Sequence, residues 1–257
     1  MTTLMMRTCE SFRPRGRPEG LTAGGVQAMI EDGSNRPVRL TPEVIVDAAV
    51  RIAARGRPDG LTGRALGEEL GVDRSAVWRH FSDKDALLRA VGDRLLTMAH
   101  DRVPAGLGPK ERMEHLAGAV VAVFTEHPHV GAAVAPRTTR GPGEFALVEM
   151  MLAALDELGL EPADVVRYQR MMAEAVLSYA GMQAGHALLP DKLRAGDERA
   201  WTHEYVGADA GRYPAIAVHA SALAEVGPDL VLATMIEAFW TALDARADTA
   251  SARVRTD

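Results

Sequence analysis

Residues 62–81, TGRALGEELGVDRSAVWRHF, place two short helical segments on either side of a glycine turn. Thr62 and Asp73 are typical helix N-caps, and Gly71 is a typical residue at the end of a helix. The apolar side chains recur at helical spacing and predict one inner face, made by Ala65, Leu66, Leu70, Val72, Val77 and Phe81. Together these features predict a helix-turn-helix over residues 62–81, although the pattern alone also fits other small helical hairpins.

Helical periodicity continues on both sides of this segment. Thr41 caps a helix that begins at Pro42, and residues 82–85 (Ser-Asp-Lys-Asp) are typical of a capping box that opens another. Later helices are predicted at about 109–126, 144–158, 162–189, 215–224 and 228–247. His127-Pro128 ends the first of these, and residues 190–214 are predicted to be a loop with at most one short helix. Because no convincing strand alternation occurs, the sequence predicts an all-α fold.

Three regions differ in composition. Residues 1–38 are rich in Arg, Pro and Gly without apolar periodicity, which predicts a flexible tail. Residues 39–100 hold the predicted helix-turn-helix and form a candidate N-terminal three-helix domain. Residues 101–250 contain the longer helices of a candidate C-terminal bundle.

Net charge has to be divided along the chain to be informative. The total is −6, but residues 39–101 carry ten basic and ten acidic side chains, whereas residues 102–257 carry fourteen and twenty-one. Within residues 74–84, the three basic residues Arg74, Arg79 and Lys84 are accompanied by Asp83 near the end of the segment. This excess of positive charge predicts a small basic patch. Phosphate binding depends on local charge, so an acidic body does not exclude a nucleic-acid-binding end.

Several protein classes are disfavoured. No run of 18 apolar residues predicts a membrane span, and the N-terminus lacks the apolar core of a secretory signal. The single Cys9 predicts neither an internal disulfide nor a zinc site. A cytoplasmic location, with no membrane partner, fits these features.

The segment from Leu61 to Leu88 resembles the DNA-binding domain of the tetracycline-repressor (TetR/AcrR) family. In that family the third helix ends in an aromatic-x-His-Phe motif, here Trp78-Arg79-His80-Phe81, and a lysine opens the fourth helix, here Lys84. The resemblance implies a bacterial DNA-binding transcriptional regulator, most commonly a repressor, associated with the nucleoid when bound. It covers about residues 39–96 well and weakens after residue 100.

The resemblance also implies roles for four residues. Thr62 and Lys84 correspond to phosphate contacts, each at a helix N-terminus, where backbone N–H groups favour an anion. Trp78 stands where the family usually has tyrosine, and its indole can donate a hydrogen bond but cannot accept one. His80 corresponds to another contact with the DNA backbone.

Arginines are the candidates for contacts with base edges. Arg64 and Arg74 are predicted to bridge guanine O6 and N7, with a phosphate clamp as the alternative for Arg74. Ser75 and Arg79 complete the outward face. A separate arm with an Arg-Pro-Arg-Gly-Arg core resembles minor-groove-binding hooks, with a solvated linker as its alternative; its basic residues are Arg13, Arg15 and Arg17.

The C-terminal half shows no catalytic motif, which predicts that the chain is not an enzyme. His127-Pro128-His129 is interpreted as a helix end, so no metal site is predicted. One stripe in the long helix predicts either a ligand-pocket wall or ordinary core. Together with His115, the predicted pocket residues are Tyr168, Met172, Tyr179, Met182 and His186.

The last helix is apolar on two sides and must be covered on both. Its two stripes are Leu232, Ile236, Phe239 and Leu243, and Val231, Met235, Ala238 and Ala242. The family resemblance implies that the long helix and the last helix form a four-helix bundle with a second subunit. It thereby implies a homodimer on a palindromic operator, released by a small-molecule effector of unknown identity, with no cofactor. Alternatives are a small-molecule-binding helical protein or a helical adaptor without DNA binding.

Overall fold

Helices are the only regular elements in residues 39–56 and 61–254, the part of the chain that this computed structural model describes, with side chains described to residue 246. The all-α prediction is confirmed for these residues. From Leu40 on they form one compact unit. The predicted tail, with Arg13, Arg15 and Arg17, lies outside the described residues. The predicted boundary between residues 39–100 and 101–250 stays a prediction.

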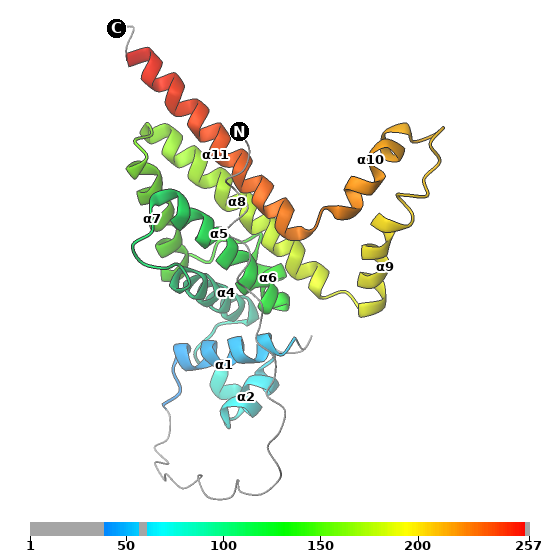
Figure 1. Cartoon of the computed structure of the whole chain (residues 1–257). Coiled ribbons are helices and arrows are strands. Elements are labelled where there is room, and N and C mark those ends of the chain that lie inside the picture. Colours follow the sequence, from blue (N-terminus) through cyan, green and yellow to red (C-terminus); the bar gives the residue numbers. More distant parts are fainter. Residues whose placement is uncertain (1–38, 57–60, 255–257) are drawn as a thin grey trace, which may run out of the picture. The chain divides into compact units, whose positions relative to one another are not determined.

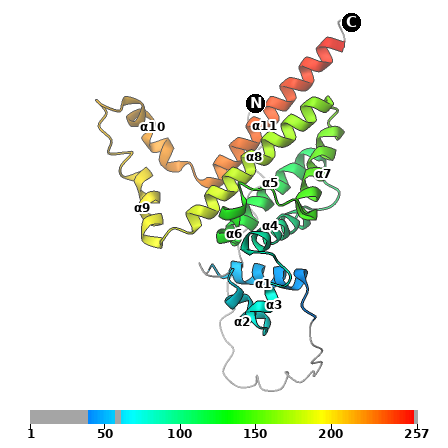
Figure 2. The same cartoon turned by 180° about the vertical axis from the view of Figure 1, so that it is seen from behind.

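The helices follow one another along the chain as shown in Figures 1 and 2. They are α1 (Pro42–Ala54), α2 (Gly63–Leu70), α3 (Arg74–Val77), α4 (Lys84–Asp101), α5 (Pro109–Glu126), α6 (Pro128–Val134), α7 (Pro142–Glu157), α8 (Pro162–Ala187), α9 (Asp191–Thr202), α10 (Pro214–Glu225) and α11 (Pro228–Val254).

Local capping sets the ends of the first helices. The Thr41 hydroxyl accepts the Val44 N–H at 3.3 Å at the start of α1, and the Thr62 hydroxyl accepts the Ala65 N–H at 3.2 Å at the start of α2. Gly71 ends α2 with a φ of +65°, a conformation that favours glycine. The predicted helix-turn-helix is therefore present, with α2 and α3 as its two helices.

The start of α4 corrects one prediction. Its N-cap is Asp83, which accepts the Ala86 N–H at 2.7 Å, and not Ser82 as a capping box beginning there would require. The Ser82 hydroxyl instead donates to the Asp83 carboxylate. An ionised carboxylate is the stronger acceptor for a helix N–H, so α4 begins at Lys84.

The body of the unit is built around α8. This helix packs along α5, α6 and α7, α4 packs against α5 and α7, and α1 joins the N-terminal helices to α4 (Figure 1). Ile45, Leu66 and Val77 are fully buried, in the same core cluster as Leu95 and Phe124. The N-terminal helices thus share a continuous core with the helices behind them.

One helix, α6, was not predicted from the sequence, and another, α9, was left open by it. α6 begins at Pro128 with His127 as its N-cap, where only a helix end is predicted, because the chain turns sharply and continues helically. A Cβ on Gly131 would lie 2.5 Å from the Phe124 carbonyl oxygen, so glycine permits this turn. α9 occupies Asp191–Thr202, as the one short helix that the prediction for residues 190–214 allowed, and it buries no residue. Without a buried face it has no apolar periodicity to detect.

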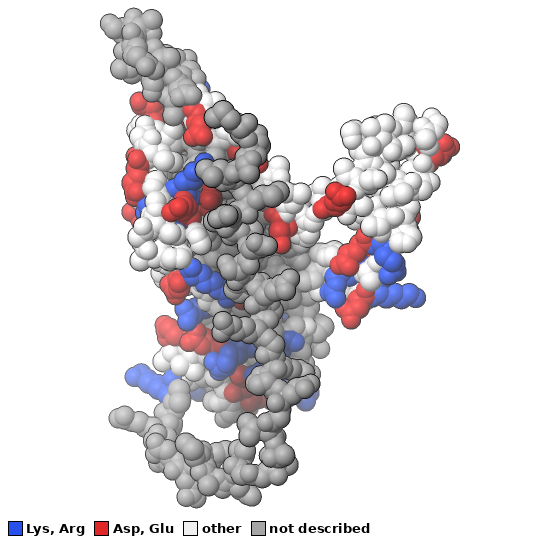
Figure 3. Space-filling model, in the orientation of Figure 1, with Lys and Arg blue, Asp and Glu red and all other residues white. Residues whose placement is uncertain are grey.

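α9 and α10 pack against each other and lie away from the other helices in both views (Figures 1 and 2). Figure 3 shows charged side chains crowded on α9 and nearly absent from α10. No single described helix is long and apolar enough to cross a membrane, although α10 and the first part of α11 together, bent by 102°, pass that test of length and composition.

Candidate nucleic-acid interface and internal cavity

Two glycines on one face of α2 determine how closely α3 approaches it. A Cβ on Gly67 would lie 2.7 Å from the Val72 carbonyl oxygen and 3.3 Å from the Arg74 backbone nitrogen. A Cβ on Gly63 would lie 2.4 Å from the Trp78 indole nitrogen. The predicted inner face consisted of Ala65, Leu66, Leu70, Val72, Val77 and Phe81 and did not include these glycines. Their spacing of four, which places them on one helix face, could have identified them.

This crossing brings several predicted DNA-binding side chains together. A single surface depression is lined by Thr62, Gly63, Arg64, Arg74, Ser75 and Trp78. Trp78 is 37% exposed, with its indole beside the first turn of α2. The depression therefore combines guanidinium groups, hydroxyls and an indole on the outer side of α2 and α3. The two interactions that phosphate and base edges require, charge and directed N–H donors, are both present.

Most of the basic groups near this surface form no close ion pair. Arg79, His80 and Lys84 are exposed outside the depression. Among the ion pairs between described residues, none includes Arg74, Arg79 or Lys84. Arg64 pairs with Glu68 at 2.9 Å, but both side chains are mostly exposed, so this pair opposes redirection of the guanidinium only weakly.

The start of α3 is held by Asp73. Its carboxylate accepts the Ser75 N–H at 2.8 Å. Hydrogen bonds from the Ser75 side chain and backbone lower the pKa of Asp73, which keeps the carboxylate ionised at neutral pH. The cap therefore fixes the first turn of α3, from which Arg74 and Ser75 project.

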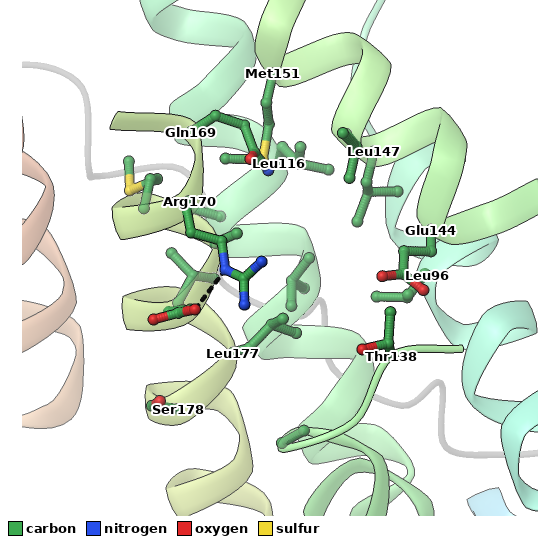
Figure 4. Close-up of a pocket in the computed structure, with 18 of the residues that line it drawn as sticks. Leu96, Leu116, Thr138, Glu144, Leu147, Met151, Gln169, Arg170, Leu177 and Ser178 are labelled. Carbon is green, nitrogen blue, oxygen red and sulfur yellow. Dashed lines mark hydrogen bonds and ion pairs between the residues drawn. The ribbon is translucent and has the colours of Figure 1, made fainter. Parts of the chain in front are cut away.

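A cavity of about 530 Å³ lies between α4, α5, α7 and α8. Figure 4 shows side chains from these helices converging on it, with Thr138 from the segment after α6. Its apolar wall includes Leu96, Met113, Leu116, Val120, Leu147, Met151, Met172, Val176 and Leu177. The volume and the apolar lining are typical of sites for small organic molecules.

Of the residues predicted to line a ligand pocket, the structure places only Met172 in this wall. Tyr168 donates to the Ala242 carbonyl at 3.3 Å and meets Phe239 edge-on, with ring centroids 5.9 Å apart. Tyr179 donates to the Pro228 carbonyl at 2.6 Å. Both tyrosines therefore attach α11 to α8, and burial raises the pKa of Tyr179.

The other three predicted pocket residues also lie outside the cavity. His115 and Met182 are exposed, and His186 is half-buried. The predicted stripe is thus the side of α8 that faces α11 and solvent, and the cavity lies on the neighbouring side, which carries Gln169 and Ala173. Helical spacing identified a set of residues on one face, but it did not identify the helix that packs against that face.

The segment from residue 136 to 144 connects the cavity wall to the N-terminal helices. Arg137 lines the cavity and forms a two-point ion pair with Asp85, in the first turn of α4. This hydrogen-bonded guanidinium lowers the pKa of the Asp85 carboxyl, which remains ionised at neutral pH. Asp85 follows Lys84 directly in the sequence. The ion pair between Arg137 and Asp85 therefore links the cavity wall to the residue next to a predicted phosphate contact.

A second attachment of this segment is centred on Asp93 of α4. This carboxylate is only 9% exposed and accepts the Thr139 hydroxyl at 2.7 Å. It also accepts the backbone N–H groups of Gly143 and Glu144, each at 3.0 Å, at the start of α7. A buried carboxylate that caps another helix holds α4 and α7 in a fixed relation.

Histidine at the end of α5 has a structural role. The buried His127 ring contacts the Val123 carbonyl through Nδ1 at 2.8 Å, and His129 contacts the Gly56 carbonyl through Nε2 at 3.2 Å. In the described part of the chain, no group of three or more His, Cys, Asp or Glu side chains is placed to hold a metal ion.

Comparison with known proteins agrees with this architecture. Residues 45–91 match the family of bacterial regulatory proteins described as the tetR family, and residues 107–228 match the tetracyclin repressor-like C-terminal domain. Apo ActR from Streptomyces coelicolor has the same fold, with a TM-score of 0.69 over 82% of this chain and 98% of its own, at 21% identity.

Two relatives of similar extent carry regulator names. An HTH-type transcriptional regulator of Saccharopolyspora erythraea is 28% identical over 196 residues, which cover 76% of this chain and 80% of the relative. The HTH-type transcriptional repressor DrrR1 of Streptomyces coeruleorubidus is 26% identical over 217 residues, with 79% and 80% covered. With both halves matched in order and the helix-turn-helix in place, the chain belongs to the TetR family of DNA-binding transcriptional regulators.

Proposed function

We propose that the chain is a repressor that binds a palindromic operator as a homodimer and releases it when a small molecule occupies the cavity. The observation that carries the DNA-binding part is the group of exposed basic side chains around α2 and α3, most of them outside any close ion pair, beside the exposed Trp78. The relative named as a repressor, DrrR1, supports the direction of regulation. Such a regulator would act on DNA in the cytoplasm, without a cofactor or enzymatic activity.

In this proposal Arg64 and Arg74 contact base edges, and Thr62 and Lys84 contact phosphates. The Thr62 hydroxyl accepts a bond from its own helix, and its proton remains available for a phosphate oxygen. The defining test is a gel shift with the DNA upstream of the chain's own gene against scrambled DNA of equal length. A shift that is neither salt-sensitive nor sequence-preferring in any ligand-free condition would contradict the proposal.

Variants at the two kinds of contact should behave differently. Arg74→Ala is expected to cost about 1–3 kcal/mol on the operator and to relax one base position. Lys84→Ala should weaken operator and scrambled DNA alike and reduce the salt slope by about one. Titrations between about 50 and 200 mM salt measure both effects. Lys192→Ala, at an exposed lysine of α9, is the matched control. An unchanged slope in Lys84→Ala would remove the phosphate contact.

The homodimer is proposed to form through the uncovered sides of α8 and α11. These sides expose apolar and small residues: Met171, Ser178 and Met182 of α8, and Val231, Ala238 and Ala242 of α11. The neighbouring stripe of α11, which includes Phe239 and Leu243, is buried in the core. Covering both stripes of α11 therefore requires a second molecule on the outer one.

Placing a charge on this outer side should separate the subunits. Ala238 is exposed in the single chain, so we expect the Ala238→Arg variant to fold. The arginine should oppose apolar contact between the subunits. Light scattering after size exclusion should then report the mass of one chain instead of two. Ala122→Arg, at an exposed position of α5, should leave the mass unchanged. A dimer retained by Ala238→Arg would place the interface elsewhere.

Release of DNA is proposed to pass through the segment from 136 to 144. Ligand that fills the cavity and shifts this segment would move Arg137 together with its paired Asp85, next to Lys84. The DNA affinity then changes by the difference in the ligand's affinity for the two arrangements. The structural basis is that one short segment touches both the cavity and the start of α4.

A further inference from the structure

Gln169 of α8 is a buried polar side chain whose hydrogen-bonding capacity is almost unused. It is 8% exposed and lines the cavity. Its one hydrogen bond among the described residues runs from Nε2 to the sulfur of Met151, at 4.0 Å. A carboxamide offers two N–H donors and two oxygen lone pairs, and thioether sulfur is a weak acceptor. Figure 4 shows the side chain extending toward Met151 and Leu116.

Buried amides nearly always have hydrogen-bond partners, and one whose partner is only a thioether sulfur calls for a specific explanation. The surroundings offer few protein partners, because Met113, Met151 and Met172 belong to the wall of the same cavity. Thioether side chains adapt their shape to a ligand but supply no strong hydrogen bond. The amide groups of Gln169 that lack a strong partner are therefore available to a ligand in the cavity.

The charged groups of the wall already have partners. Arg137 is paired with Asp85, and Arg170 with Glu174 at 2.5 Å. Glu144 accepts a backbone N–H at 2.7 Å. The pair of Arg170 with Glu174 is mostly exposed and opposes a charged ligand only weakly, so the larger cost is the burial of a charge against the apolar side chains of the wall. The electrostatics of the wall thus favour a neutral ligand.

We propose that the cavity selects a neutral, mostly apolar, ring-sized molecule with one carbonyl or hydroxyl oxygen, and that Gln169 determines this selectivity by hydrogen bonding to that oxygen. The inference rests on the proposed function, because it names the ligand class of the proposed effector site. A cavity of about 530 Å³ has room for a molecule of several fused rings.

The test uses the full chain and three probes that share the fluorene ring system, of which the two neutral ones have nearly the same shape. Fluorenone has a ring carbonyl, fluorene has a methylene in its place, and 9-fluorenecarboxylate carries a negative charge. Dissociation constants come from equilibrium dialysis. We expect fluorenone to bind about tenfold more tightly than fluorene, as one hydrogen bond to a buried amide allows. The carboxylate should bind more weakly than either neutral probe.

Gln169→Met removes the amide and keeps the length of the side chain. It should lower fluorenone affinity to that of fluorene and leave fluorene affinity unchanged. Gln183→Met, on α8 outside the cavity wall, is the matched control and should keep the tenfold preference. Leu177→Trp, which fills the cavity, should weaken both neutral probes and locate their site.

Several outcomes would overturn the inference. These are no binding of either neutral probe, an undiminished preference in Gln169→Met, or tighter binding of the carboxylate. A Gln169→Met variant that fails to fold would show that the amide is already satisfied by the protein, which also overturns it. The gel shift without ligand is independent of these results, so its failure contradicts the proposed function, whereas a failure of the probes alone contradicts only the ligand class.

Discussion

Gly67→Ala is expected to reduce operator affinity by about tenfold or more and to destabilise the fold by about 1–3 kcal/mol. The added Cβ would lie 2.7 Å from the Val72 carbonyl oxygen, which belongs to the backbone of the turn and has little freedom to move. The turn has to shift, and the shift carries Arg74 away from the position that α2 sets for it. Gel shifts measure the affinity, and urea unfolding measures the stability.

The matched control is Gly118→Ala in α5. A Cβ there would meet nothing within 4 Å, so the change should stabilise its helix by about 0.5–1 kcal/mol and leave operator binding unchanged. Equal effects of the two substitutions would contradict the requirement for glycine where α2 and α3 cross. An affinity loss in Gly67→Ala without a loss of stability would still agree with a displaced α3.

Asp93→Ala is expected to lower the free energy of unfolding by about 3 kcal/mol. The substitution leaves the backbone N–H groups of Gly143 and Glu144 without their acceptor, and the Thr139 hydroxyl keeps only its bond to the Glu144 carboxylate. Those two amide protons should also exchange faster with solvent, because they lose their only capping group. Urea unfolding and residue-resolved hydrogen exchange measure the two effects.

Asp47→Ala is the matched control for this change. Asp47 pairs with Arg94 of the same α4 at 3.1 Å, but both side chains are about half exposed, so its loss should cost at most about 1 kcal/mol. Exchange at Gly143 and Glu144 should be unaffected. If the two aspartate variants lost equal stability, Asp93 would not hold α4 to α7 as the geometry indicates.

Features that depend on a few neighbouring residues were predictable from the sequence. Caps act within one turn, so Thr41, Thr62 and Asp73 identified helix starts, and Gly71 identified the left-handed end of α2. The exception at Ser82 and Asp83 has the same local basis, because two candidate caps stood side by side. The grouping of Thr62, Arg64 and the α3 side chains also followed from the predicted helix-turn-helix, although their contacts with DNA stay predictions.

Features that depend on the packing of distant helices were not predictable in this way. The stripe containing Tyr168 and Tyr179 was correctly periodic, but its neighbour is mostly α11 and not the cavity. The ion pair of Arg137 with Asp85 joins residues 52 positions apart, and no local pattern links them. Gln169, one position after Tyr168, lay outside the predicted pocket set for the same reason.

The sequence alone therefore determined that residues 62–81 form two helices around a glycine turn, because periodicity, caps and a left-handed glycine are local properties of the chain. Only the tertiary structure decided which side of α8 borders a cavity and which buried polar side chain there has only a weak hydrogen-bond partner. Those outcomes depend on how α4, α5, α7 and α11 pack around α8, and one turn of a helix carries no information about which distant helix will cover each of its sides.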